Sequence, residues 1–103
     1  MLIQQGDVLF LQVNNLPVGG EKKETDVIVE GEFTGHAHRI DRRADQLSAF
    51  LYLVAGTLYL KNLEMCRVVH EEHNTVELPP GVWQIGRVRE YDHFGEEAKM
   101  VRD

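Results

Sequence analysis

The sequence lacks what several kinds of protein require, beginning with cysteine. Cys66 is the only cysteine among 103 residues, which excludes a disulfide within one chain and a metal cluster made of thiolates. Its neighbours in residues 64–69 favour a small buried side chain over a reactive nucleophile. A single thiol without a disulfide framework predicts a protein of the reducing cytoplasm.

A long apolar run is also missing. The most apolar stretch, residues 47–60, is interrupted by Ser48, Gly56 and Thr57, and it is shorter than the roughly 20 residues of a membrane-spanning helix. Residues 1–7 have neither the basic region nor the apolar stretch of a signal peptide. We therefore expect a soluble cytoplasmic protein without a membrane partner.

Basic residues are scarce as well. The 11 lysines and arginines against 17 acidic residues give a net charge of −6, which repels phosphate backbones and argues against a nucleic-acid partner. The arginines that could still form a local basic patch are Arg39, Arg42, Arg43, Arg87 and Arg89. Solvated loop and strand charges are the favoured interpretation of them. An oligonucleotide-binding type of barrel would depend on Trp83, Arg87 and Arg89 alone, and it ranks last among our hypotheses.

Short β-branched and aromatic runs fill the chain, and no segment sustains a helical period. Expected strands cover residues 8–13, 27–29, 50–54, 57–61, 65–69, 75–78 and 82–91. Turn signals separate these runs, and residues 21–24 are expected to be a charged loop tip. We predict an all-β fold, either a small β-barrel or a sandwich, and a single domain over residues 1–103.

Two stretches give more detailed expectations. The tripeptide Leu-Tyr-Leu occurs at residues 51–53 and again at residues 58–60, on both sides of a short glycine-containing connection, which predicts a hairpin. Apolar residues alternate along residues 82–91, as in a strand with one buried face. Trp83 and Tyr91 are expected to pack in the core with their polar tips satisfied.

The five histidines are unevenly distributed. His36 and His38 lie one residue apart after Gly35, while His70 and His73 lie three apart. On an extended strand the first pair faces one side, since strand side chains alternate. The second pair converges if the two glutamates between its members form a turn or bulge. Either pair alone would suit an ordinary surface, but the two pairs together predict that these four side chains hold one metal ion.

Histidine ligands leave the identity of this divalent metal open among zinc, nickel, copper and iron(II). A carboxylate from Glu71, Glu72 or Asp41 could take the place of one histidine. Glu71 or Glu72 could also hydrogen-bond a ligand, or act as a general base beside a metal-bound water. The spacing within residues 70–73 is one residue shorter than in the helical zinc-protease motif, so it does not predict a protease. His93 is expected in an exposed turn.

Residues 31–38, GEFTGHAH, followed by the turn PPG at residues 79–81, resemble the metal-binding pattern of the cupin superfamily. The resemblance implies a double-stranded β-helix barrel with a metal bound by a His-x-His pair. The match is partial. Cupins carry a glutamate shortly after the pair, where this chain has Asp41 and two arginines, and a histidine after the turn, where it has Gln84.

A second resemblance covers nearly the whole chain. Its landmarks are QGDVL at residues 5–9, TGHAHRI at 34–40, HEEH at 70–73, LPPG at 78–81 and REY at 89–91. They are similar to the landmarks of a family of short uncharacterised bacterial proteins. That family has no assigned activity. The resemblance therefore supports residues 1–103 as one folding unit and implies no reaction.

Two classes of function follow from these observations. The leading hypothesis is a metal-binding β protein with the four paired histidines as ligands. An open coordination position there would admit a small-molecule ligand, but no enzymatic reaction is selected. The alternative is a metal-free β module that acts as a homo-oligomer or as part of a larger assembly, because a small β chain supplies strand edges. Asp7 and Arg89 are expected to form an ordinary ion pair.

Overall fold

The computed structural model describes residues 1–31, 35–42, 48–88 and 100–102, and these described residues contain no α-helix. The strands are β1 (Leu2–Gln5), β2 (Val8–Val13), β3 (Glu21–Lys23), β4 (Val27–Glu30), β5 (Ala37–Ile40), β6 (Ala49–Val54), β7 (Thr57–Asn62), β8 (Cys66–Val69), β9 (Val76–Leu78), β10 (Gly81–Arg87) and β11 (Met100–Arg102).

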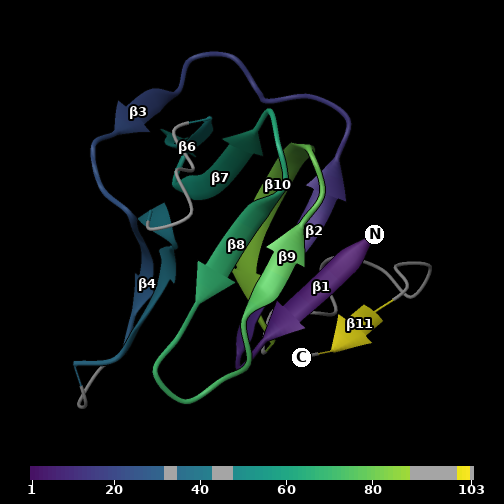
Figure 1. Ribbon diagram of the computed structural model, residues 1–103. Coiled ribbons are helices and arrows are strands. Elements are labelled where there is room, and N and C mark those ends of the chain that lie inside the picture. The colour runs from purple at the N-terminus through teal and green to yellow at the C-terminus, as the bar shows by residue number, and fades with distance from the viewer. Residues whose placement is uncertain (32–34, 43–47, 89–99, 103) are drawn as a thin grey trace.

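The strands form two sheets that pack face to face. One sheet has seven strands in the order β11-β1-β2-β10-β7-β6-β3, and the other has four in the order β4-β5-β8-β9. Figure 1 shows β8 and β9 in front of β10 and β2. Neighbouring strands run antiparallel except β1 and β11, which are parallel. The predicted all-β class is confirmed, and of the two expected architectures the described strands form the sandwich and not a closed barrel.

The hydrophobic core lies between the sheets and takes side chains from both. Phe10 and Trp83 come from the larger sheet, and Cys66 and Val68 come from the smaller one. Trp83 is fully buried and its Nε1–H donates to the Pro79 carbonyl over 3.0 Å, as predicted for a core tryptophan. Burial also raises the pKa of the Cys66 thiol to about 11, so this cysteine is a core residue, as its neighbours predicted. Tyr91 lies outside the described residues.

The predicted hairpin is formed by β6 and β7. Its register pairs Leu51 with Leu60 and Tyr52 with Tyr59, so the two Leu-Tyr-Leu segments face each other. The turn residues Ala55 and Gly56 have φ angles of 50° and 83°. Positive φ at both positions is the requirement of a type I′ turn, the two-residue connection that matches strand twist.

Three short strands, β1, β3 and β11, were not predicted. Glu21–Lys23 was expected to lie in a charged loop tip, but it forms β3 and pairs with β6 at the end of the larger sheet. Lysine is a residue that edge strands use to discourage further pairing, and Lys22 Nζ lies 4.5 Å from the centre of the Phe50 ring. The strand β1 also precedes the first predicted run and pairs with β2.

None of the described residues belongs to a helix of the length and apolarity needed to cross a membrane.

Candidate functional site

The structure brings four histidines together. His38 belongs to β5 and His36 lies just before it, while His70 and His73 lie in the loop between β8 and β9. The ring centre of His70 is 4.3 Å from that of His38, 4.7 Å from that of His73 and 5.7 Å from that of His36. The rings of His38 and His73 are stacked at 6.1 Å. We call these four residues the histidine cluster.

Strand pairing explains why the two pairs meet. β5 and β8 are antiparallel neighbours with Arg39 opposite Val69, so the end of β8 lies beside the start of β5. The chain bends at residues 71–73, which is the turn that the convergence of His70 and His73 requires. Glu71 Oε1 accepts a hydrogen bond of 2.9 Å from the Ala37 N–H and thereby fixes this loop to β5.

The tight turn between β1 and β2 packs against the same cluster. Gln5 pairs with Val8, so Gly6 and Asp7 form a two-residue connection. Gly6 has a φ of 59°, and a Cβ atom placed there would lie 2.5 Å from His73 Nε2. Glycine suits position 6 for two reasons: the φ is positive, and a larger side chain would displace the imidazole of His73.

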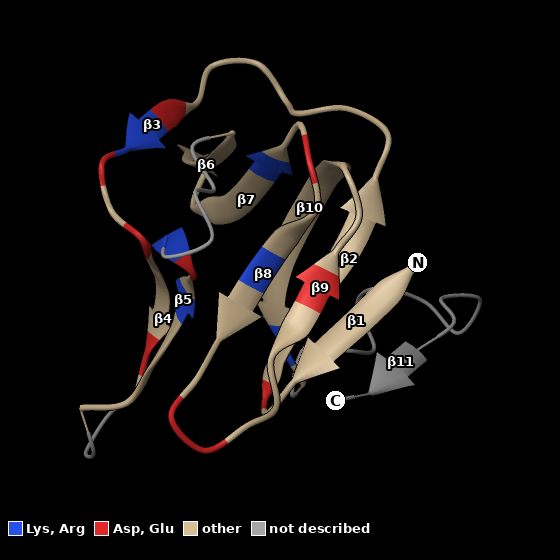
Figure 2. Cartoon of the chain, viewed as in Figure 1, with Lys and Arg blue, Asp and Glu red and all other residues tan. Residues whose placement is uncertain are grey.

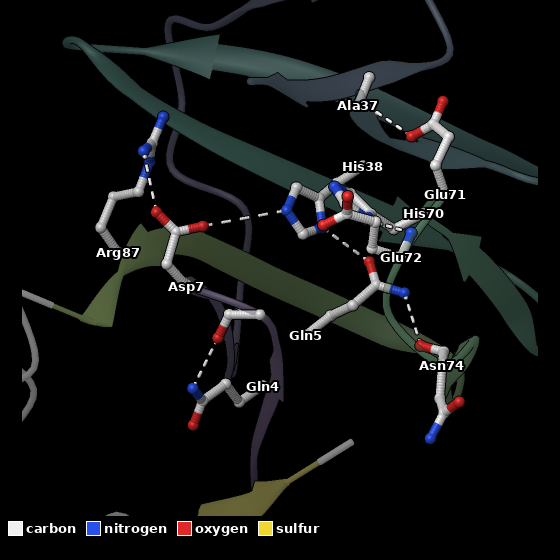
Figure 3. A network of polar contacts seen from close by, with 11 residues as sticks. Gln4, Gln5, Asp7, Ala37, His38, His70, Glu71, Glu72, Asn74 and Arg87 are labelled. Atoms are coloured by element: carbon white, nitrogen blue, oxygen red, sulfur yellow. Dashed lines mark hydrogen bonds and ion pairs between the residues drawn. The ribbon is translucent and has the colours of Figure 1, made fainter. Parts of the chain in front are cut away.

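Gln5 determines which nitrogen of His38 carries the proton. The Gln5 side chain is fully buried, and its Nε2 donates to the carbonyl of Val68 over 2.9 Å. It also donates to the carbonyl of Asn74 over 2.9 Å (Figure 3). Its Oε1 therefore acts as the acceptor toward His38 Nδ1, 2.8 Å away. Because an amide oxygen cannot donate, Nδ1 of His38 carries the proton and Nε2 keeps its lone pair.

Burial keeps His38 neutral. Its side chain is 5% exposed, and desolvation together with the nearby His70 lowers the pKa of His38 to about 4. Burial and the charge of His73 also lower the pKa of His70. Neutral imidazole is the form of histidine that binds metals, so protons compete weakly for these two side chains at neutral pH.

His70 and His36 both contact Glu72. His70 Nδ1 accepts a hydrogen bond of 3.0 Å from the Glu72 N–H, so the proton of neutral His70 is on Nε2. His36 Nδ1 lies 3.4 Å from Glu72 Oε1. A metal bound to His70 through either nitrogen would remove the bond to the Glu72 amide. Nδ1 would give up its lone pair, and ligation by Nε2 would move the proton to Nδ1.

Glu71 is the carboxylate that comes nearest to forming a ligand group with these histidines. One ligand atom each from His36, His70 and Glu71 lies within 4.8 Å of the others. The Ala37 N–H bonded to its carboxylate lowers the pKa of Glu71, which keeps it ionised. Asp41, the third carboxylate considered from the sequence, is buried and lines a neighbouring cavity of about 430 Å³ together with Asp26.

The histidine cluster lines a polar cavity of about 380 Å³. Its charged walls are Asp7, Glu30, Glu72 and Arg87, three carboxylates against one guanidinium. Figure 2 shows the acidic residues of the loop between β8 and β9, of which Glu72 lines the cavity. A cavity with this excess of negative charge attracts a cation more readily than an anion.

The described arginines do not gather into a basic patch, because carboxylates neutralise three of them. Arg39 Nη2 lies 3.5 Å from Glu71 Oε2, and Arg42 Nε lies 2.7 Å from Asp26 Oδ1. Arg87 and Asp7 form a third pair. Arg43, Arg89 and His93 lie outside the described residues.

Sequence reasoning missed the turn residues Gln5, Gly6 and Asp7 as parts of the site. Asp7 pairs with Arg87 over 3.2 Å and also faces His38. The pair expected with Arg89 falls outside the described residues. The one available signal was the segment QGDVL at residues 5–9, which is a landmark of the second resemblance. That resemblance does not give the segment a function.

No curated protein and no solved structure matches this chain. A family model described as a domain of unknown function (DUF8820) matches residues 4–88, a span that includes the whole histidine cluster and the turn between β1 and β2. The chain therefore belongs to the DUF8820 family, whose description assigns no function.

Proposed function

We propose that the protein binds one divalent transition-metal ion at the histidine cluster, with His36, His38, His70 and His73 as candidate ligands. The observation that carries the proposal is the state of His38. It is buried and neutral, and Gln5 orients it so that the Nε2 lone pair faces the cavity. A metal-binding histidine characteristically donates its other ring N–H to a fixed acceptor, which sets the tautomer and the ring orientation.

The surroundings of His38 support a cation further. A neutral histidine kept only for structure would place its second nitrogen opposite a hydrogen-bond donor. His38 Nε2 instead has the Asp7 carboxylate 3.9 Å away. A cation between these two atoms would be coordinated by a lone pair from each.

Small side-chain rotations would bring the ligand atoms of one group, His36, His70 and Glu71, to the spacing of a metal centre. Two ligands of one tetrahedral zinc ion lie about 3.4 Å apart, because metal–ligand bonds are about 2.0 to 2.2 Å long. The ligand atoms of His36, His70 and Glu71 already lie within 4.8 Å of one another. His36 is partly exposed, so its rotamer can adjust. Glu71 would have to exchange its hydrogen bond from the Ala37 N–H or its ion pair with Arg39 for the metal. Histidine with carboxylate suits zinc, nickel, copper or iron(II), and the resemblance to the cupin metal-binding pattern agrees with this choice.

The cavity leaves space for more than the ion. Its volume of about 380 Å³ exceeds that of a metal with one water, so a small-molecule ligand could reach an open coordination position. With a metal bound, Glu72, whose carboxylate lies 3.4 Å from His36 Nδ1, would be the group to accept a proton from a bound water. No substrate or reaction is selected by these features.

Elemental analysis of protein purified without a histidine tag or chelator tests the proposal. We expect about one metal ion per chain in the wild type and none in the double variant His36→Ala and His38→Ala, with the β-rich circular dichroism spectrum retained. A matched control, the double variant Arg67→Ala and Glu77→Ala, truncates two exposed side chains at paired positions of β8 and β9. This control should keep its metal. Full metal retention in the double histidine variant would contradict the assignment.

A metal-free association module is the second candidate. The strands β3 and β11 end the larger sheet and β4 and β9 end the smaller one, so the described structure has sheet edges that another copy could extend. Light scattering during size-exclusion chromatography, with and without added zinc, measures this. A stable oligomer in protein that contains and accepts no metal would favour this function over metal binding.

A further inference from the structure

A carboxylate faces the lone pair of His38. Asp7 Oδ1 lies 3.9 Å from His38 Nε2, beyond hydrogen-bond distance (Figure 3). Gln5 holds the ring proton on Nδ1, so both of the facing atoms are hydrogen-bond acceptors. Two acceptors in this arrangement have no direct attraction to each other, and a cation between them would satisfy both.

The separation suits one metal ion. With bonds of about 2.0 to 2.2 Å, two ligands of one ion lie between about 3.4 Å apart at the tetrahedral angle and at most about 4.2 Å apart. The observed 3.9 Å falls inside this interval. The Asp7 side chain is 64% exposed, so its carboxylate can move by a few tenths of an ångström without displacing other groups.

The position of Asp7 is determined by the fold on two sides. The two-residue turn between β1 and β2 places it directly after Gly6, whose backbone packs against His73. On the other side, Arg87 Nη1 donates to Asp7 Oδ2 over 3.2 Å, which directs Oδ1 toward His38. Metal-binding carboxylates are commonly held in this way, with one hydrogen-bonded partner outside the coordination sphere.

We infer that Asp7 is a ligand of the same metal ion, binding through Oδ1 while Arg87 holds Oδ2. This inference rests on the proposed function, and it adds a residue that sequence reasoning had placed in an ordinary ion pair. The centre is then a mixed site of imidazoles and one aspartate. Such sets bind zinc or iron(II) and often keep positions for water or a ligand.

The test compares Asp7→Asn with Glu30→Gln in the full-length protein. Each substitution removes one negative charge from the same cavity with almost no change in size; the inference makes Asp7 a ligand, whereas Glu30 only lines the wall. Zinc affinity is measured by competition with a chromophoric chelator, and the visible absorption of the cobalt(II) form reports the ligand set. Circular dichroism checks that both variants fold.

We expect Asp7→Asn to weaken zinc binding by at least about tenfold and to change the cobalt spectrum. Glu30→Gln is expected to weaken binding by less than about threefold, because it changes only the long-range field. If the wild type binds zinc and both variants bind equally well with unchanged cobalt spectra, Asp7 is not a ligand and the proposed function stands. If the wild type binds none of zinc, cobalt, nickel, copper and iron(II), both proposals are overturned.

Discussion

Two buried carboxamides, Gln5 and Asn62, illustrate how one chemical group does different work at two places in the sandwich. Both are almost completely inaccessible to solvent, and both use their amide N–H groups to hold backbone carbonyls. Asn62, at the end of β7, donates to the carbonyls of Glu64, Leu78 and Pro79 over 2.8 to 3.0 Å. It fixes the connection that leads into β10.

The difference lies in the oxygen atoms. Asn62 Oδ1 has no hydrogen-bond partner among the described residues, whereas Gln5 Oε1 accepts from His38. The Asn62 amide therefore only holds backbone groups in place. The Gln5 amide also fixes the orientation of His38, a side chain in the cavity. A buried amide thus points to a functional site when the oxygen left over from its structural hydrogen bonds contacts a titratable side chain.

The largest effect is expected for Gln5→Met, which keeps the side-chain length and removes the amide. The His38 N–H and the Val68 carbonyl lose their partners, so we expect a loss of about 3 kcal/mol in the free energy of unfolding. Zinc affinity should also fall about 10- to 100-fold, because the ring of His38 is no longer oriented. Urea denaturation and chelator competition measure the two quantities. An unchanged affinity would show that Gln5 is only structural.

Asn62→Leu should change stability alone. The Leu78 and Pro79 carbonyls lose a donor, while the unpaired Oδ1 is removed at the same time. We expect a loss of about 2 kcal/mol in the free energy of unfolding, somewhat less than for Gln5→Met. Zinc affinity should stay within about twofold of wild type, since the residue touches nothing in the cavity. A large loss of affinity would mean that the two regions are coupled.

Two turn glycines extend the comparison. Gly6 and Gly56 both have positive φ, but only at Gly6 would a Cβ collide, with His73; nothing lies within 4 Å of a Cβ at Gly56. Each alanine variant should lose about 1 kcal/mol of stability from backbone strain, with Gly6→Ala losing somewhat more from the collision. Only Gly6→Ala should also weaken zinc binding, as measured by the same competition assay. Equal affinities in the two variants would contradict the close approach to His73.

The smallest expected effect concerns Cys66, a buried group without a role in the cavity. The thiol has a pKa of about 11 in the folded protein, raised from 9.0 by desolvation. Between these values the unfolded chain loses a proton that the folded chain keeps, so stability falls as the pH rises from 9 to 11. At pH 10 the loss is roughly 1 kcal/mol. Urea denaturation of wild type and Cys66→Ala at pH 8 and pH 10 isolates the contribution of the thiol. The variant lacks the thiol, and all other titrating groups are common to both proteins.

Most of the fold could be predicted because its strands are local patterns. The runs that became β2, β6, β7 and β8 are rich in β-branched and aromatic residues, and the hairpin of β6 and β7 has matching tripeptides in register. The strands that were missed, β1, β3 and β11, are only three or four residues long. β3 consists of three charged residues and exists because β6 offers it an edge, which is tertiary context that no local pattern contains.

The site could be predicted only in part, for a similar reason. The histidine pairs are visible in the sequence because each has chelating spacing. Gln5 and Asp7 are invisible because their partners are distant along the chain: Gln5 meets His38 across 33 positions and Asn74 across 69. Glutamine and aspartate are ordinary at a hairpin, and only the packing of one sheet on the other turns them toward imidazoles.

The hydrogen bond from the Glu72 amide to His70 has a consequence for how the site would exchange its metal. A metal that engages His70 replaces this bond, and a net hydrogen bond of about 1 kcal/mol corresponds to roughly a fivefold change in affinity. If the ion left, the Glu72 N–H would again donate to His70 Nδ1, as it does in the structure. His70 would thus alternate between two partners, while His38 stays fixed by Gln5. One fixed ligand and one exchangeable ligand would favour reversible metal binding over permanent metal binding.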